Sequence, residues 1–318
     1  MFFKLMFISF RGISSVFLFG VAGYLIIAGC KPDPRFMDFI AKLLKRVALP
    51  CLMFSTMVTR FRIEDVELWW IYPLVAVAIN LSGVILAYGY MGIDRSVTFR
   101  GEFKVLVAFQ NGIFLPLAFA PALFDPQTLP YFLTLLFLFN LLSIPTFFIL
   151  AVWMVNASEG IRFRIRDFFS PPVAATVLGF IIAAAGWGSL MPEFLMKPMA
   201  SIGSLATPLS MLLVGGIIVI NLPKAKPGDW REPVKISFLK CFIFPLLACV
   251  FVYIVRPPEY LGLLIILESA MPSAMLIALI ASDDPGKQRV IAGAILLTSL
   301  ICILTIPFFM GIYGALYG

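Results

Sequence analysis

Two short segments that pair polar residues with a proline hold most of the candidate chemistry of this chain. The first reads Phe109-Gln110-Asn111-Gly112-Ile113-Phe114-Leu115-Pro116, and the second reads Glu268-Ser269-Ala270-Met271-Pro272-Ser273. A proline inside a helix lacks an N–H and leaves the carbonyl four residues earlier without its partner. Pro116 therefore releases the carbonyl of Gly112, and Pro272 releases that of Glu268. With two amides and a serine beside them, these breaks predict a binding site built from backbone and neutral polar groups.

Three further polar residues lie in apolar surroundings. Asn140 can line the same site or bond to a neighbouring helix, and Ser55 can face the cavity or simply pack at a helix interface. Glu268 is a carboxyl in a long apolar run, where charge is costly and usually functional. We predict that it couples binding to a proton or a sodium ion, or else ties two helices together.

Composition limits the class of protein that these residues serve. Of 318 residues, 61% are hydrophobic and 13% are charged, against about 25% charged in a soluble domain. The net charge of +7 comes from bases scattered between uncharged runs, which argues against nucleic-acid binding. No His is present and the five Cys lack ligand spacing, so we expect no disulfide framework, metal site, cofactor or enzyme chemistry. A polytopic membrane protein remains.

The runs without charge predict ten membrane-spanning helices, since a span needs about 20 mostly apolar residues. The runs are Gly12–Cys30, Val47–Thr59, Trp69–Ile93, Val105–Phe124, Gln127–Ser158, Phe168–Pro192, Pro198–Pro223, Cys241–Val255, Tyr260–Ser282 (interrupted by Glu268) and Val290–Gly318. Two of them are short, and we expect the bases before them, Lys240 among them, to extend from a helix end towards the membrane surface. The short loops predict one membrane domain over residues 1–318.

Proline contexts predict an internal repeat. Four prolines of the first half recur in the same order in the second half, with similar neighbours: Pro50 with Pro208, Pro73 with Pro245, Pro116 with Pro272, and Pro145 with Pro307. Each half, about 1–158 and 159–318, holds five predicted helices. An odd number reverses the second half in the membrane, which gives the inverted repeat of secondary transporters with broken helices 4 and 9 crossing at the centre.

The distribution of Lys and Arg predicts the orientation. Of the 24 bases, six fall on the side of the two termini: Lys4, Arg11, Arg60, Arg62, Lys197 and Arg256. The other 18 fall on the opposite side, which the positive-inside rule places in the cytoplasm. We therefore predict a multi-pass protein of the cell membrane with both termini outside and a cytoplasmic central loop.

The same segments resemble the auxin efflux carrier family, which includes plant PIN proteins and prokaryotic malonate-type carriers. The resemblance rests on Phe109-Gln110-Asn111-Gly112 with Leu115-Pro116-Leu117, on Ala270-Met271-Pro272-Ser273-Ala274, and on the stretch from Leu297-Thr298-Ser299 to Leu304-Thr305-Ile306-Pro307. The chain departs from that family at Glu268, where a small or apolar residue is expected. It also lacks the large cytoplasmic loop of long plant members.

The resemblance implies a fold, a partner and a site. Helices 1, 2, 6 and 7 would form a scaffold, usually dimeric, and helices 3–5 and 8–10 a transport domain. Asn111, Pro116, Pro272 and Ser273 would lie at the substrate crossing, lined by Asn140 and Ser55. We thus expect a secondary transporter that moves a small organic anion, such as an auxin-like carboxylate or a dicarboxylate, by elevator-type alternating access.

Two alternatives remain open at this point. A sodium-coupled carrier similar to the bile acid:sodium symporters shares the ten-helix inverted repeat and carries a carboxylate in its ninth helix, although Pro272-Ser273 replaces the Gln-Asn expected there. A membrane receptor that does not transport is the other alternative, but it predicts no inverted repeat.

Overall fold

The regular secondary structure of the protein is helical in the part that the computed structural model describes, residues 1–29, 34–62, 64, 66, 68–155, 170–209, 230–274, 277 and 284–317. No strand element occurs in these ranges, and the one strand-like pairing among them is an isolated antiparallel bridge between Gln110 and Ser273. The expected all-helical class is confirmed.

The helices follow the predicted apolar runs. In chain order they are α1 (Phe2–Gly29), α2 (Pro34–Leu43), the π-helix η1 (Leu44–Ala48), α3 (Leu49–Arg60), α4 (Ile71–Ile93), α5 (Arg100–Ala108), α6 (Phe114–Leu123), α7 (Leu129–Val155), α9 (Pro171–Ala184), the short 3₁₀ helix η2 (Trp187–Leu190), α10 (Glu193–Ser204), α12 (Arg231–Phe238), the π-helix η4 (Leu239–Ile243), α13 (Phe244–Val255), α14 (Glu259–Ala270) and α16 (Pro285–Tyr317).

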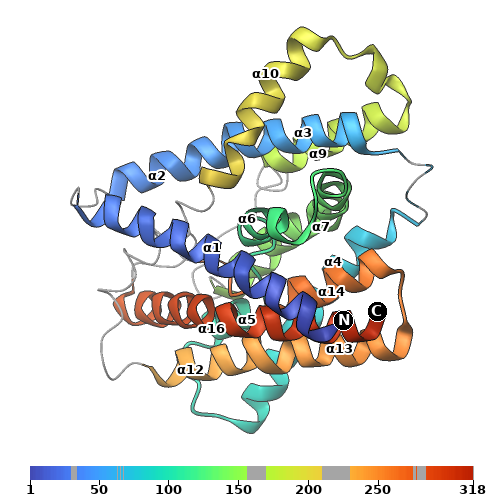
Figure 1. Ribbon diagram of the computed structural model, residues 1–318. Coiled ribbons are helices and arrows are strands. Elements are labelled where there is room, and N and C mark those ends of the chain that lie inside the picture. The colour runs from blue at the N-terminus through green and yellow to red at the C-terminus, as the bar shows by residue number, and fades with distance from the viewer. Residues whose placement is uncertain are drawn as a thin grey trace.

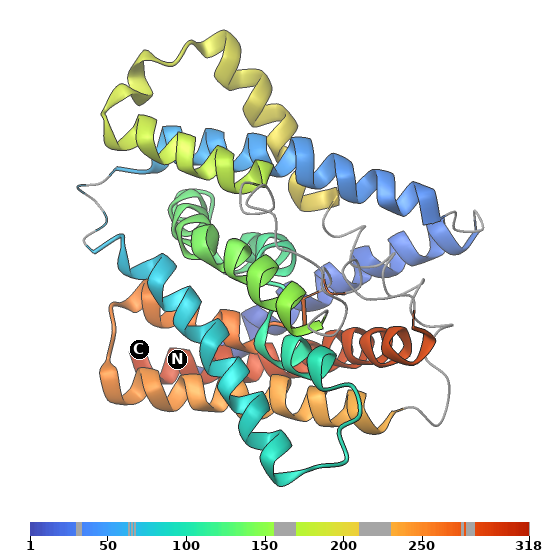
Figure 2. The same ribbon diagram turned by 180° about the vertical axis from the view of Figure 1, so that it is seen from behind.

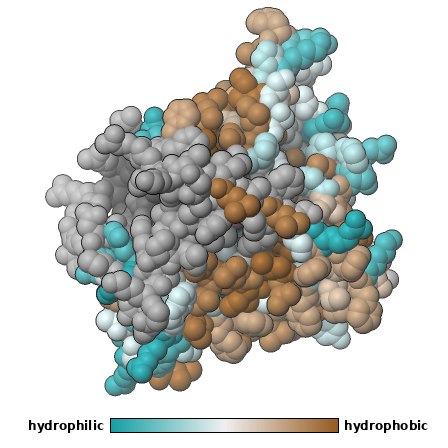
Figure 3. Space-filling model, turned by 60° about the vertical axis from the view of Figure 1, so that its left-hand side comes forward, coloured by the Kyte–Doolittle hydropathy of each residue, from teal (hydrophilic) through white to brown (hydrophobic). Residues whose placement is uncertain are grey.

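Within the described ranges, four stretches of helix are both long and apolar enough to cross a membrane: Ile71–Ile93, Leu129–Val155, Arg231–Val255 and Gly286–Tyr317. The side chains on one face of the molecule agree, because a broad apolar area lies between hydrophilic groups at two edges of the view (Figure 3). A multi-pass membrane protein is therefore supported. The count of ten spans and the inverted repeat stay predictions, and the repeat boundary at 158–159 lies outside the described residues.

The two short predicted runs are parts of longer helices. The run Val47–Thr59 belongs to a continuous helical path through α2, η1 and α3, and the run Cys241–Val255 continues a helix that begins at Arg231. Lys240 consequently lies in the middle of its helix and is fully buried. The expectation that Lys240 extends from a helix end to the membrane surface was wrong, because the helix starts ten residues earlier than the uncharged run.

The helices form two groups with α6 and α7 between them. In Figures 1 and 2, α2, α3, α9 and α10 lie together on one side, and α4, α5, α12, α13, α14 and α16 lie on the other. α3 packs along α9 and α10, while α4 packs along α5 and α7. α1 runs along α16 and also contacts α6. The broken segments of the chain lie where the two groups meet.

The two termini lie side by side (Figure 1). The ring of Phe2 packs against the ring of Phe308 and below Gly311, and Leu5 packs against Gly314. The start of α1 therefore contacts the end of α16, which places both ends of the chain at the same face of the molecule.

Charged residues assigned to the cytoplasm by the sequence gather at one end of the helices. Lys235 forms an ion pair of 2.6 Å with Asp94, and Lys287 forms one of 3.3 Å with Glu102. The bond from Lys235 holds the pKa of Asp94 below its ordinary value, and the backbone N–H of Ser96 adds to this effect. These contacts connect the loop after α4 and the start of α5 to α12 and α16.

Candidate functional site

The first break separates α5 from α6. α5 ends at Ala108 and α6 begins at Phe114, so residues 109–113 leave the helical path. Pro116 is the third residue of α6, within the first turn, where a helix needs no N–H donor. The proline thus favours the start of a new helix here over continuation of α5, and it exposes the backbone of the five intervening residues.

The second break follows α14. Ala270 is the last residue of that helix, and Met271 adopts an extended conformation with φ −65° and ψ 146°. Pro272 requires such an extended residue before it. The chain then runs through Ser273, whose N–H donates to the hydroxyl of Thr298 in α16 at 3.3 Å.

The two breaks cross and share backbone hydrogen bonds. The N–H of Asn111 donates to the carbonyl of Pro272 at 2.8 Å, and the N–H of Ala274 donates to that of Phe109 at 3.0 Å. The hydroxyl of Ser273 donates to the carbonyl of Leu106 in the last turn of α5 at 2.7 Å. Each segment therefore satisfies polar groups that the other loses by leaving the helix, as membrane depth demands.

Asn140 of α7 holds the carbonyl that Pro116 releases. Its Nδ2 donates to Gly112 O at 2.9 Å and to Leu136 O at 3.0 Å. The absence of a side chain at Gly112 is needed for this approach. A Cβ there would lie 2.5 Å from Oε2 of Glu268 and 2.9 Å from Oδ1 of Asn140.

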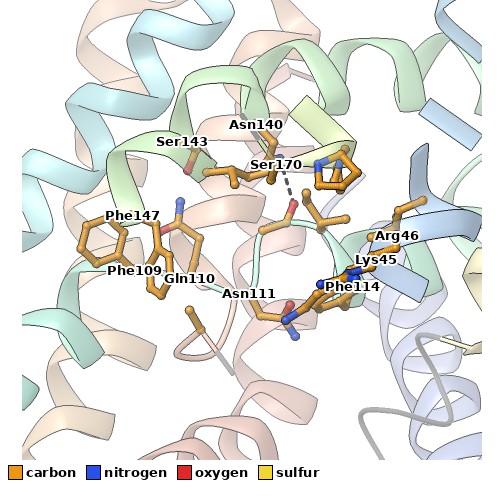
Figure 4. A pocket seen from close by; sticks show the side chains of 17 residues that line it. Lys45, Arg46, Phe109, Gln110, Asn111, Phe114, Asn140, Ser143, Phe147 and Ser170 are labelled. Atoms are coloured by element: carbon orange, nitrogen blue, oxygen red, sulfur yellow. Dashed lines mark hydrogen bonds between the residues drawn. The ribbon is translucent and has the colours of Figure 1, made fainter. Parts of the chain in front are cut away.

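A cavity of about 230 Å³ lies beside the crossing, between the two helix groups. Its polar lining comes from Lys45 and Arg46 in η1, from the break, from Asn140 and Ser143 in α7, and from Ser170. Figure 4 shows the two bases on one side of the cavity and Phe109 and Phe147 on the other. The apolar lining is Leu49, Phe109, Ile113, Phe114, Ile144, Phe147, Pro171, Pro172 and Ala274.

The electrostatic character of this cavity suits an anion. The N-terminal ends of α6 and α9 both contribute lining residues, and the N-terminus of a helix carries partial positive charge. Two side-chain cations, Lys45 and Arg46, add to it. Within the described part of the chain, Nδ2 of Asn111 and both amide atoms of Gln110 have no hydrogen-bond partner. A ligand with carboxylate oxygens would supply acceptors for the two donors among these atoms, Nδ2 of Asn111 and Nε2 of Gln110.

The sequence-predicted site residues fall into three groups. Gln110, Asn111, Gly112 and Asn140 line the cavity. Pro116, Pro272 and Ser273 shape the crossing without lining the cavity. Ser55 does neither: it is buried in α3 and donates to the carbonyl of Leu52 at 3.2 Å.

Sequence reasoning did not place Lys45 and Arg46 at the cavity, because it treated them as bases at a helix end. The signal was present in their position, since they precede Pro50 by one helical turn or slightly more. Asn80 behaves as a tie between helices, because its Nδ2 donates to Ser143 Oγ at 3.0 Å. Among the described residues, no cluster of three His, Cys, Asp or Glu side chains is placed to hold a metal ion.

Glu268 lies next to the crossing and is fully buried. The amides of Asn140 and Gln110 face its carboxyl without meeting it in hydrogen-bond geometry, and the ammonium of Lys240 interacts with it electrostatically. The protein therefore buries an acid beside the crossing and a base in η4 that acts on it, of which the sequence predicted the first only.

An all-helical fold with apolar helices long enough to cross a membrane, and a cavity beside two crossing helix breaks, is typical of multi-pass membrane transporters. Residues 13–310 match the model of the family described as membrane transport protein, and the chain belongs to this family of auxin efflux carriers. The predicted resemblance is thereby confirmed.

A curated relative has the same general character. The chain is 26% identical over 153 residues to an uncharacterized transporter of Methanothermobacter thermautotrophicus. The aligned region covers 48% of this chain and 49% of the relative. The match thus spans about half the length of that protein. At the level of the family, these comparisons indicate a transporter and not an enzyme.

Proposed function

We propose that the protein is a secondary transporter of a small organic anion, which binds in the cavity beside the crossing. The observation that carries this proposal is the meeting of Lys45 and Arg46 with the amide-rich break, at a cavity that also receives the N-terminal ends of α6 and α9. A cavity of about 230 Å³ suits an auxin-like carboxylate or a dicarboxylate better than a large amphiphile.

The proposed mechanism is elevator-type alternating access. The cavity lies between η1 and α9 on one side and the break and α7 on the other, so movement of one group along the other would carry a bound anion across the membrane. The proposal includes ten spans in two inverted repeats and a homodimer formed through helices 1, 2, 6 and 7. It also places both termini outside the cell and the central loop in the cytoplasm.

One observation favours a second candidate, a cation-coupled carrier of the bile-acid-symporter type. Glu268 is buried at the crossing, where a proton or a sodium ion could balance its charge. We propose coupling through Glu268 in either carrier. The small cavity and the Pro272-Ser273 sequence support the auxin-carrier type.

The test is flux of radiolabelled dicarboxylates and aromatic carboxylates into proteoliposomes that hold the purified protein. We expect saturable uptake of at least one of these anions, and faster uptake when unlabelled anion is present on the other side. Saturable binding without any flux, under proton and sodium gradients of either direction, would contradict the transporter and support a receptor.

A further inference from the structure

Lys240 is a lysine buried in the membrane interior that the proposed transport site does not use. Its side chain is 0% exposed, and its ammonium finds no hydrogen-bond partner among the described residues. Ionised lysines are rarely tolerated in such a position without a counter-charge.

The depth of Lys240 matches that of Glu268. Lys240 lies nine residues after Arg231, the first residue of α12, and Glu268 lies nine residues after Glu259, the first residue of α14. At 1.5 Å per residue both lie about 13 Å along their helices. Because α12 and α14 enter from opposite faces in the proposed topology, both residues reach the middle of a hydrocarbon layer of about 30 Å.

Lys240 does not extend back towards the nearer surface. Its Nζ lies 4.7 Å from the ring centroid of Phe244, one turn further along the helix from Arg231. A lysine that reached for water would point the other way. The cation–π contact therefore holds the ammonium inside the protein.

Among the groups that surround Lys240, Glu268 is the one that can carry the opposite charge. The π-helix η4, which carries Lys240, packs against α14, which carries Glu268. Within the described ranges, Lys240 and Glu268 form no direct hydrogen bond, and the charged and titratable groups that act on Lys240 through space are Cys241 and Glu268. The thiol of Cys241 donates to Thr298 O at 3.8 Å, and that of Cys302 donates to Ser299 O at 2.9 Å, so both thiols serve as neutral donors to α16. α7 and the first break contribute the neutral amides of Asn140 and Gln110.

We propose that Lys240 is a built-in counter-cation for Glu268, and that it stands in place of a metal cation at the crossing. The inference rests on the proposed function in one respect, namely that the crossing belongs to a transport site. Each residue alone would leave an uncompensated charge in the interior, which is strongly destabilising, whereas the pair is neutral overall. The carrier then requires no sodium ion, and of the two couplings proposed above the proton remains.

The consequence for a variant without the lysine is specific. In Lys240→Met the carboxylate of Glu268 loses its counter-charge but keeps the side-chain amides of Asn140 and Gln110 that face it. A small cation from solution can then bind there, and the protein should acquire a dependence on sodium that the wild type lacks.

The experiment measures thermal unfolding of the purified protein in detergent, in sodium chloride and in choline chloride of equal concentration. We expect no difference for the wild type. Lys240→Met should unfold several degrees lower in choline and recover most of that loss in sodium. The double variant Lys240→Met/Glu268→Gln should regain stability in choline and show no sodium effect, and Lys240→Arg should resemble the wild type.

Lys104→Met is the matched control. Lys104 also lies 4.7 Å over an aromatic ring, that of Tyr88, but at the end of the helices near solvent. Its loss should produce no sodium effect. If Lys240→Met cannot be purified, recovery of folded protein from the double variant supports the pair.

Three results would overturn the inference. They are sodium stabilisation of the wild type that disappears in Glu268→Gln, a Lys240→Met variant with no sodium effect, and a double variant as unstable as Lys240→Met. None of these readouts involves transport. A failure of the proposed anion transport would therefore be seen separately, in the flux assay.

Discussion

The N–H of Asn111 donates a 2.8 Å hydrogen bond to the carbonyl of Pro272, and this bond joins two helices that break 161 residues apart in the sequence. The bond pairs a donor released at one break with an acceptor released at the other. Because the backbone is satisfied in this way, the side chain of Asn111 remains available to the cavity. Backbone groups therefore hold the crossing together, while side chains line the cavity beside it.

The first prediction concerns Asn111 and Pro116. Asn111→Ala removes a cavity donor and should weaken anion binding about fivefold, the worth of one hydrogen bond of about 1 kcal/mol. Pro116→Ala permits the helix to close over the break and should weaken binding at least as much. Isothermal titration with the transported anion measures both effects.

Asn80→Ala is the control for the first prediction. Asn80 is also a buried amide, but it bonds to Ser143 and does not line the cavity. Its loss should lower the melting temperature while leaving affinity near the wild-type value. Unchanged affinity in both Asn111→Ala and Pro116→Ala would place the binding site elsewhere.

The second prediction concerns Arg46, which lies at the more exposed side of the cavity. Arg46→Gln should raise the Kd for the anion about 5- to 10-fold, since partly exposed charge contacts are worth roughly 1 kcal/mol or slightly more. The wild-type Kd should rise with salt concentration, and the variant should show a smaller rise. Arg60→Gln, at the far end of the same helical path, should bind as the wild type does.

How far the sequence predicts this site can be judged from particular residues. Pro116 and Pro272 locate both breaks because a missing N–H acts locally, whatever surrounds it. Lys240 could not be placed in this way. A base next to an uncharged run resembles a helix end, and the position of Arg231 at the true start of the helix depends on packing against α5 and α16.

The residues that line the cavity also depend on tertiary packing, which limits how well the sequence predicts them. Asn140 was predicted with two open roles, and the structure shows it both bonded to Gly112 and lining the cavity. Lys45 and Arg46 reach the cavity because α2, η1 and α3 form one long path past α6, a tertiary arrangement that no local pattern encodes. Local chemistry is therefore readable from the sequence, while the partners of charged groups are not.

The third prediction concerns Gly112. In Gly112→Ala the added methyl group would meet the carboxyl of Glu268 at 2.5 Å and the side-chain oxygen of Asn140 at 2.9 Å. Both would have to shift, which should cost about 1–3 kcal/mol and lower the melting temperature by several degrees. Gly89→Ala is the matched control, because nothing lies within 4 Å of a Cβ at that position of α4. Equal melting temperatures for the two variants would contradict the close approach of Glu268.

The fourth prediction concerns orientation. In a Cys-free background, a cysteine at Ser96, in the loop between α4 and α5, should react with an impermeant maleimide only after the cells are opened. A cysteine at Gln127, in the turn between α6 and α7, should react in intact cells. Ser96 and Gln127 lie at opposite ends of the broken α5–α6 path, so the opposite labelling pattern would reverse the predicted orientation.

The last prediction tests coupling through Glu268. If Glu268 takes up a proton when the anion binds, binding should strengthen as the pH falls, by up to about tenfold per pH unit. Glu268→Gln keeps the shape of the side chain and cannot change its charge. We therefore expect this variant to bind the anion with an affinity that no longer varies with pH, measured by titration between pH 5 and 8 without sodium. Glu259→Gln is the control, because Glu259 lies at the start of the same helix, near solvent, and its loss should leave the pH profile intact. The comparison isolates the buried carboxyl: a pH profile that persists in Glu268→Gln assigns coupling to another group, and Glu268 is then a structural partner of Lys240 alone.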